Sequence, residues 1–327
     1  MRVFLACLAL AGLAPAHLGS GDDVQPRDTV SVIESVSPAL PDGVRVDIVG
    51  ADTFVRLRAN GHSVRVPGYE AEPYIDIAPD GTVRENIAST TSKLNVNRFG
   101  FAYVPTESGK VNWRQTATDG TAMWHDHRVH WMSPSTPAVT DDRGTVQHWT
   151  LPLVVDGTTH TVSGTLYLRA HRAFAWWFTA VFGAATVGLL ALRHRRRYRA
   201  SLVWVAVLGT VTGTLQWVSM PATARITPLM MLFCLGALLA AVIAVVLGRR
   251  EDKGPQTEWI ASSVSAGAGA AMLLAAWMSW QQVQSAWLPM IGPMWMARVT
   301  VTTLVGAGAV AVTDGVIRAV RVQPTAG

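Results

Sequence analysis

Cysteine is nearly absent from this 327-residue chain, which contains only Cys7 and Cys234. Cys7 lies in an apolar N-terminal run, and Cys234 lies inside a long apolar segment. The polar stretch between them, residues 17–170, therefore has no disulfide and no metal site with a cysteine ligand. This absence excludes a blue-copper electron-transfer centre, which needs a thiolate.

Acidic residues are scarce in residues 171–327, whereas arginines are frequent there. The sequence pI of about 9.6 therefore reflects arginines that flank apolar segments, and not a nucleic-acid-binding face. With half of its residues apolar and 15% charged, the chain is too apolar for one soluble domain and too polar to lie wholly in a membrane. We expect two parts, and no nucleic-acid partner.

The N-terminus has the pattern of a secretory signal peptide. A basic residue is followed by an apolar run over residues 3–13 and by an A-P-A sequence that ends at Ala16. These features predict a signal peptide over residues 1–16, whose removal exposes His17 as the first residue of the mature chain.

Residues 17–170 show the alternation of apolar and polar residues that is typical of half-buried strands. Turn sequences, such as N-G at 60–61 and D-G at 156–157, separate the alternating segments. The pattern predicts an extracytoplasmic all-β sandwich, of the cupredoxin or immunoglobulin kind. The predicted strands cover residues 44–48, 54–58, 63–66, 74–77, 147–151 and 161–168.

Residues 171–327 are predicted to form a membrane domain of about five helices, because long apolar segments there approach the roughly 20 residues that a bilayer requires. Basic clusters follow the first, third and fifth segments and so fall on one side of the membrane. We expect a multi-pass protein of the cell membrane, with the β-domain extracytoplasmic and the C-terminus cytoplasmic. The predicted spans are residues 173–192, 201–219, 228–248, 259–280 and 294–313.

One segment of the outer domain, MWHDHRVHWM at residues 123–132, holds three of the nine histidines. In an extended strand His125 and His127 would lie on one face, about 7 Å apart at Cα, so both imidazoles could reach one ion. His130 would lie on the opposite face unless the strand ends near Arg128. The segment predicts a metal site, although a His-x-His pair is also common as surface decoration or as a hydrogen-bonded structural feature.

The neighbours of these histidines have expected supporting roles: Asp126 and the flanking Trp124 and Trp131 could supply hydrogen bonds to the ligands and a dry wall around the ion.

The predicted mature N-terminus offers a further ligand pair, the α-amine and the imidazole of His17. Together with His125 and His127, and with His130 as a fourth candidate, it gives a nitrogen-rich set without thiolate, which favours Cu(II) over Zn(II). Copper is the preferred metal and zinc the alternative. The amine must lose a proton to bind, and its reference pKa of about 7.7–8 makes the affinity pH-dependent.

Two resemblances follow from these residues. The N-terminal histidine, the His-x-His pair on a β-domain and the membrane anchor resemble the copper-binding soluble subunit of particulate methane monooxygenase, and the N-terminal histidine alone resembles the periplasmic CopC proteins. The resemblance implies His17, His125 and His127 as copper ligands. The string WHDHRVHWM is also similar to one in uncharacterised actinobacterial membrane proteins suspected of copper handling, and that implies no reaction.

The sequence thus favours extracytoplasmic copper binding for storage, delivery or import, with no catalytic residue assigned and a non-enzyme as the default. The expected partners are the lipid bilayer, a copper ion and another copper-handling protein. Two alternatives stay open: a copper oxidoreductase that activates oxygen, and a metal-free interaction or sensory module. Methionines near the predicted outer ends of the spans, such as Met220, are soft ligands suited to Cu(I), although methionine is also ordinary filler in spans.

Overall fold

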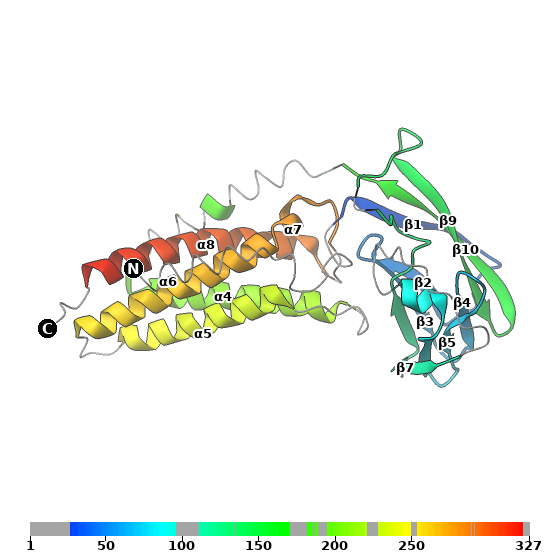
Figure 1. Cartoon of the computed structure of the whole chain (residues 1–327), viewed down its shortest axis with the longest axis horizontal. Helices are drawn as coiled ribbons and strands as arrows, with labels where there is room; N and C mark the ends of the chain where they lie inside the picture. The colour runs from blue at the N-terminus through cyan, green and yellow to red at the C-terminus, as the bar shows by residue number, and fades with distance from the viewer. Residues whose placement is uncertain are drawn as a thin grey trace.

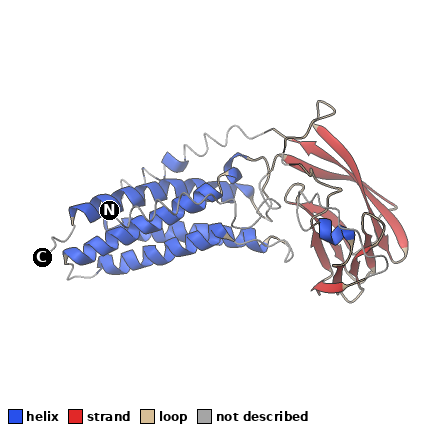
Figure 2. Ribbon diagram, in the orientation of Figure 1, coloured by secondary structure: helices blue, strands red, loops and turns tan. Residues whose placement is uncertain are grey.

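The alternating segments of the N-terminal half form strands, and the long apolar segments form helices, in the computed structural model of the chain (Figures 1 and 2). The structure describes residues 27–95, 111–133, 135–170, 182–184, 186, 188, 195–220, 228–249, 254–288, 290 and 292–322. The predicted signal peptide and His17 lie outside these residues.

Ten strands and one short helix make up the described part of the β-domain. The strands are β1 (Thr29–Ser37), β2 (Val44–Val49), β3 (Phe54–Ala59), β4 (Val64–Pro67), β5 (Pro73–Ile77), β6 (Val83–Asn86), β7 (Trp113–Ala117), β8 (Thr121–Trp124), β9 (Thr145–Val155) and β10 (Thr158–Leu168), with helix α2 (Thr90–Leu94) after β6.

These strands form two antiparallel sheets, which confirms the predicted β-sandwich. One sheet has the order β1-β10-β9-β4-β5-β6-β7, and the other has the order β2-β3-β8. The turn before β8 requires glycine, because Gly120 has a φ of +68° and a Cβ there would lie 2.6 Å from the carbonyl oxygen of Ala59. This turn places the end of β8, and the histidines that follow it, beside β3.

Alternation along the strands builds the core between the two sheets. In β9 every second side chain is buried, namely Trp149, Leu151, Leu153 and Val155, and these residues pack in one cluster with Leu57 of β3. Burial of such a layer supplies the main stabilisation of the sandwich, at roughly 25 cal/mol per Å² of apolar surface.

The membrane half contains four helices that are long and apolar enough to cross a bilayer, among the residues described. They are α4 (Arg195–Val218), α5 (Leu229–Arg249), α6 (Pro255–Met278) and α8 (Met294–Arg321), and a short helix, α7 (Gln281–Gln284), precedes α8. The sequence predicts five spans, so the described count is one lower. Most of the predicted span 173–192 lies outside the described residues.

Small residues let α6 and α8 approach closely. A Cβ at Gly269 would lie 2.7 Å from the carbonyl oxygen of Gly308, and a Cβ at Gly315 would lie 2.6 Å from that of Ser262. Between helices in a membrane, close packing of this kind replaces the hydrophobic driving force that operates in water.

The β-domain contacts one end of the bundle through the two residues before its first strand (Figure 1). Arg27 pairs with Trp287 by two backbone hydrogen bonds, and the Asp28 carboxylate accepts from the amide N–H of Ala286. Arg298 of α8 in turn donates to the carbonyl oxygens of Ser285 and Ala286. The loop between α7 and α8 is therefore held from both sides.

A second contact joins the two halves near the end of α4. Met220 is buried against Val49 and Phe54, with Met123 of β8 packed beside them. The arginine-bearing ends of the helices lie at the other end of the bundle, where Arg199 of α4 and Arg318 of α8 make ion pairs with Glu258 of α6. The end that faces the β-domain is therefore joined to it by backbone and side-chain hydrogen bonds and by an apolar cluster, whereas ion pairs link the helices at the far end.

Candidate metal centre

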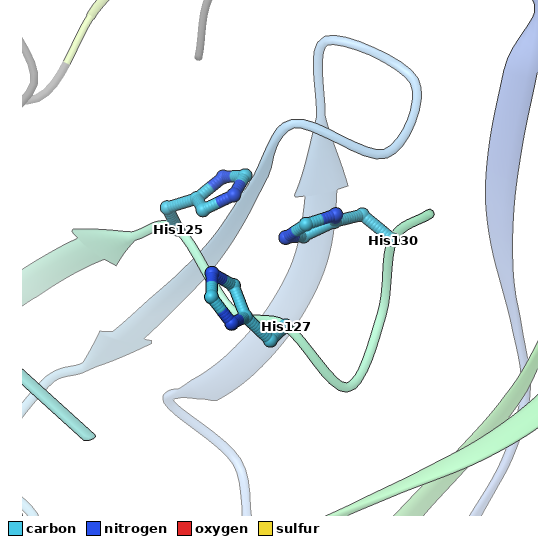
Figure 3. A group of neighbouring side chains, drawn as sticks. All are labelled: His125, His127 and His130. Carbon is cyan, nitrogen blue, oxygen red and sulfur yellow. The ribbon is translucent and has the colours of Figure 1, made fainter. Parts of the chain in front are cut away.

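The chain turns immediately after β8, and this turn assembles three histidines. Strand β8 ends at Trp124, and residues 127–129 form a turn that brings His130 back towards His125 and His127. Figure 3 shows the three rings directed towards one another. One ligand nitrogen from each lies within 4.8 Å of the others. The sequence placed His130 on the opposite face unless the strand ends near Arg128, and β8 ends earlier still, at Trp124, so His130 joins the other two.

The three imidazoles are packed together and buried. The ring centroids of His125 and His130 are 4.0 Å apart, and that of His127 lies 5.6 Å from the first and 5.1 Å from the second. Their exposed fractions are 5% for His125, 9% for His127 and 1% for His130. Burying three polar rings in mutual contact costs free energy, and a shared bound cation would offset that cost.

Backbone carbonyls fix the tautomer of two rings. The Nδ1 of His125 lies 2.7 Å from the carbonyl oxygen of Thr53, and the Nδ1 of His130 lies 2.9 Å from that of Trp131. Since a carbonyl only accepts, each Nδ1 carries the proton and each Nε2 carries the lone pair. Both Nε2 atoms are buried. This is the usual arrangement of a metal-binding histidine, which donates its other N–H to an outer acceptor.

The size of the group fits one ion after the rings move closer together. Nitrogen ligands lie about 2.0–2.1 Å from a bound Zn²⁺, so three of them around one ion are roughly 3.5 Å apart. The nitrogens here lie within 4.8 Å of one another. Ring rotations that shift each nitrogen by less than about 1 Å would bring all three to bonding distance from one ion.

Asp126 braces the loop that carries the histidines. Its carboxylate accepts from the indole N–H of Trp124 and from both the backbone N–H and the guanidinium of Arg128. Burial alone would raise the pKa of Asp126, but the hydrogen bonds and the charge of Arg128 hold it below its usual range. Asp126 and Trp124 thus stabilise the turn between the ligands. Trp131 contributes the carbonyl that accepts from His130 and packs its ring against the core.

The structure adds three residues that the sequence did not single out as part of the site. The Tyr69 hydroxyl accepts from the backbone N–H of His127 at 2.8 Å, and its ring stacks on the His127 ring at 6.2 Å between centroids. Thr53 supplies the carbonyl that orients His125, and Phe54 meets the His125 ring edge-on at 6.3 Å. Tyr69 belongs to an aromatic and acidic segment, G-Y-E-A-E-P-Y, but nothing in its spacing indicates proximity to His127.

The other described histidines of the β-domain make separate contacts. His62 lies between the Asp156 carboxylate and the carbonyl oxygen of Asp42, His148 bonds the Thr165 hydroxyl, and His160 bonds the carbonyl of Pro38. These contacts pin loops and strands, and the metal-ligand group among the described residues consists of His125, His127 and His130 alone.

Comparison with known proteins yields no protein-family model, no curated protein and no solved structure that matches the chain.

Proposed function

We propose that this chain is a membrane-anchored, extracytoplasmic copper-binding protein that stores, delivers or imports the metal. The observation that carries the proposal is the buried group of His125, His127 and His130, with Nδ1 protons held by carbonyls in two of the rings. Four membrane-length helices attach this β-domain to a bilayer.

Copper is preferred because the group offers nitrogen and no thiolate or carboxylate ligand within the described residues. Imidazole suits both copper and zinc, and the Irving–Williams order favours copper in its divalent form. The predicted N-terminal His17 and the resemblance to copper-binding proteins support the same metal. Zinc is the competitor that an experiment must address.

The proposed orientation places the β-domain outside the cytoplasm. It is supported by the predicted signal peptide and by the arginine-bearing helix ends, which lie at the end of the bundle away from the β-domain. Arg199, Arg249 and Arg318 would then lie at the cytoplasmic face.

A second candidate, a sensory module, is favoured by the hydrogen-bonded joint between β1 and the loop before α8. Metal-dependent changes in the exposure of the Trp287 loop would support this reading, and an unchanged loop would favour simple binding.

The test is metal content of the full chain, purified in detergent, loaded with copper or zinc and desalted. We expect about one copper per chain in the wild type and in the control His148→Ala, since His148 is exposed and lies on β9. His125→Ala and His130→Ala should lose the metal. Retention of full copper content in both variants would refute the site. An extra residue before His17 tests whether the N-terminal amine contributes.

A further inference from the structure

The charge around the three histidines is low. Among the described residues the ligand group contains three imidazoles, which are neutral when they bind a metal, and no carboxylate. The nearest acid in sequence, Asp126, is ion-paired with Arg128 at 2.6 Å, so the pair adds no net charge. The bound ion would therefore keep most of its own positive charge.

Burial raises the free-energy cost of placing that charge in the site. All three imidazoles are at least nine-tenths buried, and the solvation cost of an ion in a medium of low polarity rises with the square of its charge. For ions of similar size, a divalent cation thus costs roughly four times as much to bury as a monovalent one. Asp52, the neighbour of Thr53 in the chain, is buried and accepts a hydrogen bond from the Thr29 hydroxyl, so its effect on the ion has to be tested.

The hydrogen bonds that the imidazoles donate also favour a monovalent ion. His125 and His130 donate to neutral carbonyl oxygens, not to carboxylates. An ionised partner would raise the basicity of the ring and strengthen its bond to a divalent ion, whereas a carbonyl does so less. The rings are thus weaker donors than those in a carboxylate–histidine–zinc arrangement.

Two methionines pack against a residue that borders the histidine group. Phe54 meets the His125 ring edge-on and packs with Met123 and Met220. Thioethers select Cu(I) among the common biological metals. Met220 follows α4, so one of these methionines belongs to the membrane half.

Building on the proposed function, we infer that the site holds copper as Cu(I), bound by the three imidazoles of His125, His127 and His130. Cu(I) has a filled d shell and accepts three neutral nitrogen ligands without a fourth. Zn(II) completes its shell with a water or an anion, and Cu(II) prefers a tetragonal set. The β-domain would then store or pass on reduced copper.

The test compares oxidation states on the same full-length protein in detergent. Cu(I) is titrated under anaerobic conditions with ascorbate against a chromophoric Cu(I) chelator. Cu(II) and Zn(II) are titrated separately, without reductant, against chelators of known affinity. We expect one Cu(I) per chain, bound more tightly than Zn(II). Loss of His130 should weaken Cu(I) binding by more than the roughly 10–100-fold that an outer contact contributes.

Three results have distinct meanings. Cu(I) preferred over Zn(II), with an affinity unchanged in His17→Ala, supports the inference. Tighter binding of Cu(II) or Zn(II), or loss of Cu(I) binding in His17→Ala, overturns it and leaves the metal site in place. Failure to bind any of the three ions overturns the proposed function as well.

A charge-changing variant provides a second test in case an alanine variant does not fold. His127→Asp replaces a neutral ligand by an anionic one, so the preference should move from Cu(I) towards Zn(II). An added unit charge close to the ion is worth at least about tenfold at an effective dielectric of roughly 20. The matched control His148→Asp, at an exposed position on β9, should leave the preference unchanged. Asp52→Asn is a separate test: the inference expects a Cu(I) affinity within a few-fold of the wild type, and a larger loss overturns it because the site would then need a buried anion.

Discussion

The phenol of Tyr69 holds the backbone N–H of His127. This hydroxyl accepts from the His127 N–H and donates to the side-chain oxygen of Asn95, while Arg128 lies over the ring, 5.0 Å from its centroid. Burial raises the pKa of Tyr69 well above its ordinary value, so the phenol stays protonated. It therefore keeps both its donor and its acceptor role at any physiological pH.

Removing that hydroxyl should loosen His127, a ligand of the proposed metal site, without removing the stacked ring. We expect Tyr69→Phe to weaken metal binding by about 10–100-fold, the usual effect of losing an outer contact. Tyr167→Phe is the control, because the Tyr167 hydroxyl bonds Glu34 at an exposed position. Chelator competition measures both variants, and equal affinities would show that Tyr69 does not position His127.

His62 is a second residue with a testable electrostatic role. Its side-chain hydrogen bond with Asp156, and then that with the Asp42 carbonyl, raise the pKa of His62. The same bond with His62, helped by the Ser63 N–H, lowers the pKa of Asp156. Both groups lie at the surface, so the pair pins two loops together and adds little to stability.

The pH dependence of this pair follows from the raised pKa of His62 and the lowered pKa of Asp156. The His62 contribution is complete below its unfolded pKa of about 6.5 and is lost as pH rises through the raised folded pKa. The Asp156 contribution to stability is complete above its unfolded pKa of about 4 and is lost as pH falls through its lowered pKa in the folded state. NMR titration of the His62 ring should give a higher pKa in the wild type than in Asp156→Asn. Identical pKa values would exclude the ion pair in solution.

At the scale of elements, the alternating strands and the apolar helices were predictable from sequence, but the strands without alternation were not. In β1 the polar Thr29 and Ser31 are buried, whereas Val32 is 41% exposed, so its pattern is inverted. In β7, at the edge of the larger sheet, the three central side chains are exposed. β1 and β7 are strands because they pair with β10 and β6, and not because of a periodic pattern in their own sequences.

The histidine triad was predictable only in part, because its assembly also depends on contacts between residues far apart in the chain. The motif predicts His125 and His127 as a pair, since that follows from local spacing. The inward turn of His130 depends on where β8 ends and on the Asp126–Arg128 brace, and the partner of His125 is Thr53, which is 72 residues away. Long-range contacts of this kind leave no local signature.

Helix packing in the bundle gives a prediction with an internal control. A methyl group at Gly269 would meet the Gly308 carbonyl and the Ala311 side chain at 2.7 Å, whereas nothing lies within 4 Å of one at Gly267. Gly269→Ala should destabilise the bundle by about 1–3 kcal/mol through overpacking. Gly267→Ala, on the same helix, should be neutral or slightly stabilising. Thermal unfolding in detergent compares the two, and equal midpoints would contradict the α6–α8 contact.

At the scale of the whole molecule, the joint between the β-domain and the bundle rests on few groups. Asp28 accepts from the Ala286 N–H, next to the Arg27–Trp287 bridge. In Asp28→Ala we expect faster hydrogen exchange at Ala286 and Trp287, with exchange in β9 and β10 unchanged. An unaltered exchange rate in the loop would show that the Asp28 hydrogen bond does not hold the joint.

The chain enters and leaves the larger sheet of the β-domain at neighbouring positions. Thr29 at the start of β1 is paired with Leu168 at the end of β10, and the Arg169 N–H donates to the Asp28 carbonyl. Entry and exit therefore sit side by side, close to the Arg27–Trp287 bridge, and the chain after the exit leads on to the membrane half. A different sandwich fused after Leu168 would keep the covalent link to the bundle but would lose the contacts of Arg27 with Trp287 and of Phe54 with Met220. Exchange of the ligand-bearing domain is therefore coupled to the end of the bundle that it contacts.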